Sequence, residues 1–435
     1  MIFRQVALLS AVVVAVMPAK AQTEQRMTVG ELFQLVESNS KTLQEKKISV
    51  EFAQKGIEAA RAQRLPDVNA SLSASYNGNV VVMDRDFTNA QGFSSPHFGN
   101  SFALEAQQVV YAGGAIDAGI RIAELQRDMA VSGQRMTLNA QRFMALGQYL
   151  DLFKIQNRMQ VYQQNISLTQ HLIDDIRAKQ EQGMALRNDV TRYELQMETL
   201  RLGLRRLQDQ QTILNHQLCN TLGLDNVSIM PDTTLIDQAL SQDGEHYWQQ
   251  AALASSPQIE QSQLSTQLAK QQLKLAKSEM LPKLAVVAAD NFSGPFTYDI
   301  PPIDKNINYW YVGVGVRYNI SSLFKQNNKV RQAETGIQRS QEQQKVVAEN
   351  LDNQVQQAWT LYQQTYADLD TQRKSVQLAR QNYQVVSDRY LNQLALITDM
   401  LDASTIRLNA ELQEVDARIN IVYAYYKMKF IAGTL

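Results

Sequence analysis

The chain has 435 residues, of which 44% are hydrophobic and 20% are charged, and its formal net charge is −1 at pH 7. These values indicate an ordered, nearly neutral protein and give no basis for nucleic-acid binding or intrinsic disorder. Cys219 is the only cysteine, which excludes an internal disulfide.

The first residues have the pattern of an export signal. Arg4 supplies a positive charge, an apolar run follows from Val6 to Met17, and Ala19 and Ala21 form a small-x-small cleavage pattern. We therefore expect a signal peptide over residues 1–21. The alternative is an N-terminal membrane anchor, but about 12 apolar residues fall short of the ~20 that span a bilayer. No later run is long and apolar enough, so any membrane insertion must use strands.

A helix, a strand, a loop and a second strand are predicted next. Thr28 with Glu31 forms a capping box, and the apolar stripe that follows predicts one helix from 28 to 65, ended by Pro66. Apolar residues alternate with Asn and Ser from 68 to 76, which predicts a strand with two different faces. Residues 77–96 have loop composition, and Phe98 begins the returning strand.

The next hundred residues contain no proline and predict two long helices. An unbroken helix from Ala115 to Gln182 would reach about 100 Å. Gly183 suits a left-handed helix end, and Asn188 or Asp189 suits the start of the next helix. Both arms carry heptad seams, so the chain should reverse into an antiparallel coiled-coil hairpin. The seams are Leu152, Ile155, Met159, Tyr162, Ile166, Thr169, Ile173 and Ile176, then Val190, Tyr193, Met197, Leu200, Leu204, Leu207, Gln211, Leu214, Leu218 and Thr221.

The same pattern returns 210 residues later. Asp399 then corresponds to Asp189, Gln393 to Gly183, and Gly433 to Gly223. A constant offset over a hundred residues indicates a duplication. We expect repeats at 22–224 and 245–435, joined by a connector at 225–244.

The second repeat should also contain a helix, from Ile259 to Met280, and two strands, one over 283–289 and one from Tyr309. In the last strand, apolar residues alternate with Gly and with Arg317, which would be costly in lipid, so the apolar side is predicted to face acyl chains. A soluble sheet packed on a core would explain the alternation equally well. The predicted lipid-facing residues are Trp310, Val312, Val314, Val316, Tyr318 and Ile320.

Four strands cannot close a barrel in lipid, where about eight is the smallest number. Two protomers would supply eight strands and three would supply twelve, and only the larger number leaves a water path. The helical hairpins favour three protomers and twelve strands. The predicted fold class is therefore mainly α, with long antiparallel coiled-coil hairpins, four strands per protomer, a trimeric 12-stranded barrel and a periplasmic α-helical tunnel.

These features together resemble the TolC family of outer-membrane efflux proteins, over the whole mature chain. The local matches are Gly183 followed by Asp189-Val190, Arg389-Tyr390 ahead of Asp399, and the terminal Ala432 to Leu435. The resemblance implies a homotrimer in the outer membrane of a Gram-negative bacterium, with a helical periplasmic extension. It also implies coupling to a periplasmic adaptor and, through it, to an inner-membrane pump.

The resemblance places candidate functional residues at the helical tips. Tyr390 and Asp189 fall where a gating pair would lie, and Asp399 and Asp402 where acidic rings line the entrance. Ala395 stands where a basic residue often joins the gate. Packing on a neighbouring helix would also explain Tyr390, and helix capping or a solvated face would explain the two aspartates. The candidate adaptor-binding residues are Gly183, Met184, Ala185, Leu186, Gln393, Leu394, Ala395 and Leu396.

The sequence shows no enzyme motif, and its four histidines are scattered, so we expect no catalysis, no cofactor and no metal site. The predicted function is an outer-membrane exit channel of a tripartite efflux or type I secretion system. A secreted or periplasmic coiled-coil scaffold without a membrane barrel is the alternative, and a periplasmic adaptor is a third possibility. The cargo, whether drug, metal ion or protein, is not specified by the sequence.

Overall fold

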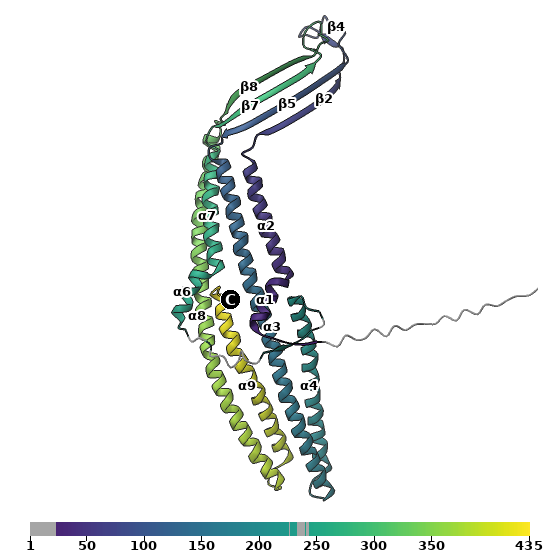
Figure 1. Ribbon diagram of the computed structural model, residues 1–435, viewed down its shortest axis with the longest axis vertical. Helices are drawn as coiled ribbons and strands as arrows, with labels where there is room; N and C mark the ends of the chain where they lie inside the picture. The colour runs from purple at the N-terminus through teal and green to yellow at the C-terminus, as the bar shows by residue number, and fades with distance from the viewer. Residues whose placement is uncertain (1–22, 226, 233–239, 241–242) are drawn as a thin grey trace, which may run out of the picture.

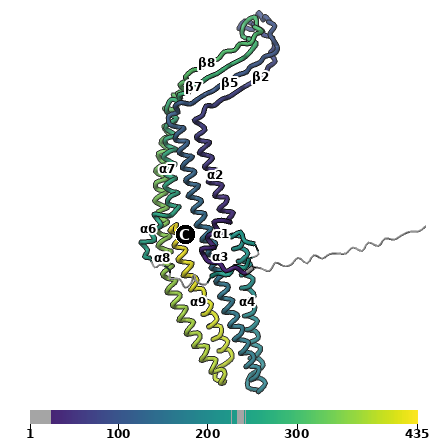
Figure 2. Tube along the Cα trace, viewed as in Figure 1, coloured from purple at the N-terminus to yellow at the C-terminus, as the bar shows by residue number. Residues whose placement is uncertain are grey.

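The computed structural model describes residues 23–225, 227–232, 240 and 243–435. It is elongated, with a curved sheet at one end and the tips of two helical hairpins at the other (Figures 1 and 2). The signal peptide expected over residues 1–21 lies outside the described residues. Within the described part, no helix is both long enough and apolar enough to cross a membrane.

The first helical segment is divided in two, so the prediction of one continuous helix from 28 to 65 was wrong. Helix α1 spans Val29–Asn39 and α2 spans Lys41–Ala62. Between them Ser40 adopts extended backbone angles, and its side chain accepts a hydrogen bond from the Leu43 N–H. Serine competes for backbone donors in this way, which starts a new helix despite the continuous apolar stripe. The capping box of Thr28 and Glu31 is confirmed.

The two long hairpins are present. Helix α3 (Ala115–Glu181) runs the length of the helical part, about 100 Å at 1.5 Å per residue, and α4 (Arg187–Leu222) returns along it. Helix α8 (Ser322–Leu391) and α9 (Ile397–Ile431) form the second hairpin. The second half begins with α6 (Glu245–Ser255) and α7 (Pro257–Ser278), and α7 packs between α3 and α8.

Helix α9 buries a row of alanines. Four of its eleven buried residues are alanines, which recur every seven residues at Ala403, Ala410, Ala417 and Ala424. Small side chains let α9 approach its neighbours closely, which apolarity alone does not reveal. The other buried residues of α9 are Met400, Arg407, Leu408, Ile419, Ile421, Val422 and Met428.

Four strands form one antiparallel sheet in the order β2-β5-β7-β8. They span Asp67–Tyr76, Phe98–Tyr111, Lys283–Gly294 and Ile307–Arg317. The third strand is longer than predicted because β7 hydrogen-bonds to a neighbour on both sides. The loop expected over 77–96 contains a small hairpin of its own, β3 (Val80–Val82) with β4 (Gln91–Phe93).

The last strand ends earlier than predicted, at Arg317, so Tyr318 and Ile320 lie beyond it. Arg317 is paired with Lys283, and the residue before Lys283 is Pro282, which has no N–H to continue the ladder. The Ser322 N–H bonds back to the carbonyl of Asn319, so the chain turns immediately into α8.

The register of the sheet collects apolar side chains on one face. Residues paired directly across antiparallel strands point to the same side, and Leu72, Phe102 and Phe292 are joined in this way. The other face carries Asn and Ser on β2, Glu105 on β5 and Arg317 on β8, together with small residues and tyrosines of β7 and β8. The exposed large apolar residues of the first face are Val68, Leu72, Tyr76, Phe98, Phe102, Leu104, Val286, Phe292, Trp310, Val312, Val314 and Val316.

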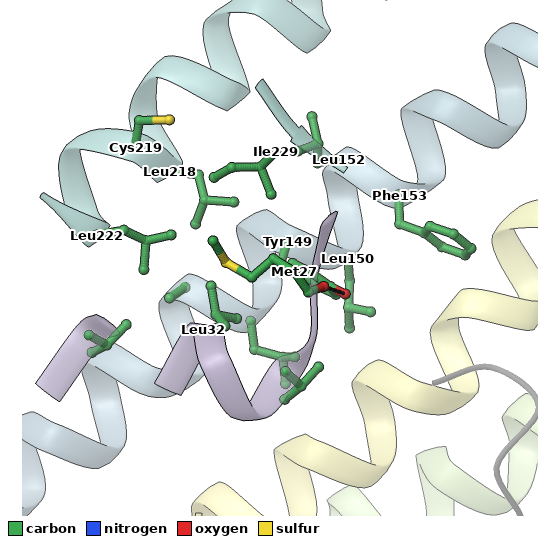
Figure 3. Close-up of a cluster of buried hydrophobic side chains, with 14 of the residues drawn as sticks. Met27, Leu32, Tyr149, Leu150, Leu152, Phe153, Leu218, Cys219, Leu222 and Ile229 are labelled. Atoms are coloured by element: carbon green, nitrogen blue, oxygen red, sulfur yellow. Dashed lines mark hydrogen bonds between the residues drawn. The ribbon is translucent and has the colours of Figure 1, made fainter. Parts of the chain in front are cut away.

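The largest buried core lies midway along the helices, where two short parallel strands cross them. Strand β1 (Thr23–Met27) pairs with β6 (Val227–Pro231), a contact the sequence analysis missed. The Tyr149 hydroxyl donates to the Met27 carbonyl at 2.7 Å and accepts from the Asp232 N–H at 2.8 Å. Figure 3 shows Met27 among side chains from α1, α3 and α4, with Ile229 beside them. This core fixes the start of the described chain to the long helices.

Candidate functional site

The tip of the first hairpin turns through a left-handed glycine. Gly183 has φ +73°, and the N–H groups of Gly183 and Met184 bond back to the carbonyls of Gln180 and Lys179. Asp189 lies in the first turn of α4, and its Oδ2 accepts the Leu186 N–H at 3.2 Å. The aspartate thus accepts a hydrogen bond from one of the N–H groups that have no partner within the helix. Its negative charge is also favourable near the positive end of the helix dipole.

The second tip repeats this geometry with glutamine in place of glycine. Gln393 has φ +62°, and the N–H groups of Gln393 and Leu394 bond to the carbonyls of Tyr390 and Arg389. Asp399 Oδ2 accepts the Leu396 N–H at 3.0 Å, as Asp189 does in the first tip. The left-handed conformation is costly for a residue with a Cβ, so the surrounding turn imposes it.

Large apolar side chains are exposed at matching positions of both tips. Met184 and Leu394 are 49% and 68% exposed, and Leu186 and Leu396 are 70% and 69% exposed. Each pair is separated by the 210-residue offset, so the two turns present similar surfaces. Both turns lie at the end of the molecule farthest from the sheet (Figure 1). Ala185 and Ala395 are half-buried.

A lysine joins the two tips. Lys179 Nζ, in the last turn of α3, donates to the carbonyl of Leu391, the last residue of α8, at 2.9 Å. A cation at the negative end of a helix is stabilised by the free carbonyls there. The second tip has Ala395 where a basic residue was expected, and a lysine of the other hairpin contacts this tip, a contact that the sequence analysis missed. Lys179 is one of many surface lysines in the sequence, and nothing local marks it.

An apolar cluster packs behind this contact. Tyr193 is 1% exposed and Met400 is fully buried, and Tyr390 packs against their cluster. Burial raises the pKa of Tyr390 to about 12, and the carboxylate of Asp189 adds to the increase. Among the described residues, no hydrogen bond joins the Tyr390 hydroxyl to Asp189, whose Oδ2 is engaged by Leu186. The structure thus brings the two residues near one another without a direct bond.

Asp399 and Asp402 are both exposed on the first turns of α9. They lie three residues apart and therefore share one side of the helix. Asp399 also bonds to the backbone of its own turn, so the capping interpretation applies to it. Exposure of both carboxylates leaves them available to solvent and to ions.

A polar network lies farther from the tips, between α3, α8 and α9. Arg407 is 9% exposed, donates to Asn165 Oδ1 at 2.9 Å, and stands 3.9 Å from the centre of the Tyr383 ring. Asn165 in turn donates to Glu411, which pairs with Arg380 at 3.0 Å. A buried arginine requires such partners, since an unpaired buried charge is strongly unfavourable. The signal available in the sequence was the position of Arg407 between Ala403 and Ala410, four residues after one and three before the other.

The arrangement defines a class of protein. Two long hairpins carry exposed apolar and acidic residues at one end, and a sheet with one apolar face lies at the other. The match to the model of the outer membrane efflux protein family covers residues 32–224 and 248–434. The chain therefore belongs to the outer membrane efflux protein family, as the resemblance to TolC-family proteins predicted, and it is an outer-membrane channel protein with a helical periplasmic part.

Solved structures show the same fold. VceC from Vibrio cholerae matches with a TM-score of 0.76 and 15% identity over 93% of this chain and 96% of that chain. CusC matches with a TM-score of 0.79 and 15% identity, covering 93% and 91%. The MtrE outer-membrane channel of Neisseria gonorrhoeae, in its open state, gives 0.72 and 13%, covering 93% and 88%. The comparison with curated proteins gives no match.

Proposed function

We propose that this chain forms, as a homotrimer, the exit duct of a tripartite efflux or type I secretion system. One observation carries the proposal. The strands are ordered β2-β5-β7-β8, and the helices attached to them contact one another in the order α2-α3-α7-α8. The sheet and the helical layer therefore end at the same two edges, as one segment of a closed wall would.

The strand edges require partners. Strands β2 and β8 are each hydrogen-bonded on one side only, and an unpaired edge in lipid leaves backbone groups unsatisfied. Pairing β8 of one copy with β2 of the next satisfies both edges, and three copies give twelve strands. Eight strands would fill their own interior with side chains, whereas twelve leave room for water.

The apolar face of the sheet is proposed to contact lipid. Trp310, Val312, Val314 and Val316 are between 65% and 74% exposed, with no covering layer among the described residues. The polar face, with Arg317, then lines the duct. Aromatic side chains such as Tyr76 and Trp310 toward the outer end suit the membrane interface.

We place adaptor binding at the two tips, because their four exposed apolar side chains form the surface farthest from the membrane. The adaptor links the duct to an inner-membrane pump. The closed state is proposed to rest on the Lys179 contact and on the cluster around Tyr390 near Asp189. Threefold symmetry would gather the exposed Asp399 and Asp402 into a ring of six carboxylates, which favours cations and repels itself, so these contacts are needed to hold it shut.

The two repeats are proposed to be 22–224 and 245–435, joined by 225–244, after removal of a signal peptide at 1–21. The left-handed residues Gly183 and Gln393, and likewise Gly223 and Gly433, are 210 positions apart, which supports this division. The proposed role is transport without catalysis or a cofactor. The family match favours this role over a secreted coiled-coil scaffold.

Native mass spectrometry of the protein purified in detergent tests the assembly. A trimer is the expected species, and a stable monomer or dimer would contradict the duct. Photo-crosslinking from Leu186 and Leu396, compared with crosslinking from Phe87 in the loop at the opposite end, tests the orientation. Adaptor captured only from Phe87 would reverse it.

A further inference from the structure

A cavity lies at the base of the sheet, where the strands meet the helices. Its volume is about 460 Å³, and its lining comes from β5, β7 and β8, from the chain just after α2, and from the start of α3. Figure 1 shows the sheet leaning away from the axis of the helices at this junction. The cavity is therefore built where the two parts of the molecule change direction.

The strand side chains that line the cavity belong to one face of the sheet. Val109, Ala285 and Gly315 are paired in a row across β5, β7 and β8, and Lys283 is paired with Arg317. Residues paired directly across antiparallel strands point to the same side. This is the polar face of the sheet, which lines the duct in the proposed function, so the inference rests on that function.

Two cations lie next to each other at one end of the cavity. Lys283 begins β7 and Arg317 ends β8, and as a direct cross-strand pair their Cβ atoms are about 4.5–5.5 Å apart. Like charges in this position repel each other. The Lys283 Nζ atom is 3.1 Å from a carboxylate oxygen of Glu279. Within the described part of the chain, Arg317 forms no ion pair.

The other carboxylates of this face leave the pair of cations uncompensated. By the register of the sheet, Asp67 and Glu105 lie on the same face. Neither lines the cavity, and among the described residues neither pairs with Lys283 or Arg317. With Glu279 as the one acid bound to the pair, a net positive charge remains at this end of the cavity. Such a charge favours an anionic ligand.

The rest of the cavity is apolar and open. Val109, Ala285 and Val287 are half-buried and form its floor, and Ile116 of α3 also lines it. A Cβ atom added to Gly315 would meet no heavy atom within 4 Å, so the missing side chain leaves space above the floor. Sites for small molecules commonly combine an apolar lining with a few polar groups that fix the orientation of the ligand.

We propose that this cavity binds organic anions that carry an apolar body, such as aromatic sulfonates or carboxylates. The anionic group lies against Arg317, whose planar guanidinium donates two parallel hydrogen bonds to such a group, and beside Lys283. The apolar body lies over Gly315, against Val109 and Ala285. The occupant is thus a small molecule in the duct, bound where the helical part meets the sheet.

Three probes separate the contribution of charge from that of the apolar floor. Naphthalenesulfonate carries both an anionic group and an apolar body. Naphthol has nearly the same body without the charge, and methanesulfonate has the charge without the body. The proposed site requires both features, so naphthalenesulfonate should bind about tenfold more tightly than either of the others.

Isothermal titration calorimetry of the full chain in lipid nanodiscs measures this binding, with empty nanodiscs as the blank. Arg317→Gln should weaken the binding of naphthalenesulfonate about tenfold or more, because a hydrogen bond to a charged group is lost. Arg331→Gln is the matched control. It removes the same charge from an exposed arginine of α8 that does not line the cavity, so the affinity should stay that of the wild type.

Gly315→Leu tests the shape of the cavity while both cations stay in place. The open space at Gly315 accepts a side chain without displacing its neighbours, but leucine then fills the volume above the floor. Binding of naphthalenesulfonate should be lost in this variant. In single-channel recordings, naphthalenesulfonate should reduce the current through the wild type, and Arg317→Gln should raise the concentration for half block about tenfold.

Equal binding by the wild type and Arg317→Gln overturns the proposed site, as does equal binding of naphthol and naphthalenesulfonate. Undiminished binding by Gly315→Leu also overturns it. Binding without any block of the current places the ligand outside the duct and contradicts the proposed occupant. Native mass spectrometry of the same samples distinguishes these failures from failure of the duct. A trimer that does not bind overturns only the site, whereas a stable monomer or dimer overturns the duct on which the site rests.

Discussion

The bond between Lys179 and the Leu391 carbonyl offers a direct test of how the tips are held together. Lys179→Met keeps the length of the side chain and removes the charge and its donors. A hydrogen bond to a charged group contributes about 1.5–3 kcal/mol when buried, and exposed pairs contribute about 0.2–1 kcal/mol. Lys179 is half-buried, so about 1 kcal/mol per protomer is a reasonable value. If three protomers open together, the closed state loses about 3 kcal/mol, which is on the order of a 100-fold change in the opening equilibrium.

Single-channel recording in planar bilayers measures this change as open probability and mean conductance. Arg187→Met is the matched control, because Arg187 carries the same charge at the same tip and is exposed. Lys179→Arg should stay near the wild type, since it retains a cationic donor. If Lys179→Met and Arg187→Met behave alike, the inter-hairpin bond does not hold the channel shut, and the apolar cluster behind it becomes the main restraint.

Four further variants examine the same end of the molecule. Tyr390→Phe keeps the ring in its apolar cluster and removes only the hydroxyl, which does not bond to Asp189, so conductance near the wild type is expected, and a large rise would show that the hydroxyl itself holds the closed end. Asp399→Asn with Asp402→Asn should lower cation selectivity, read as a smaller reversal potential in a salt gradient, and an unchanged potential would place the selective ring elsewhere. Gln393→Gly should relieve the left-handed strain by about 1 kcal/mol and slow amide hydrogen exchange in that turn about fivefold, whereas Gly183→Gln should accelerate exchange in the other turn. Equal exchange in both variants would show that the turns tolerate a Cβ freely.

The sequence alone predicted the elements with strong periodicity. The heptad spacing predicted α3 and α4, the 210-residue offset placed the second tip, and alternation predicted the apolar side of β8. These features are local or strictly repetitive, so each can be recognised without knowing its partner. The prediction failed where a side chain bonded to its own local backbone. The Ser40 hydroxyl caps a new helix and so divides the first helical segment.

The tertiary structure decided which surfaces meet. Periodicity shows that one face of a helix is buried, but it does not name the helix that covers it, because every seam is similarly apolar. The burial of Arg407, the bond from Lys179 to Leu391 and the order α2-α3-α7-α8 all depend on contacts between residues far apart in the chain. The candidate tip residues could be chosen because the sequence shows the chain reversals and the resemblance to the TolC family gives those reversals a role. Their partners could not, since packing of two hairpins more than 200 residues apart determines which side chains come within bonding distance.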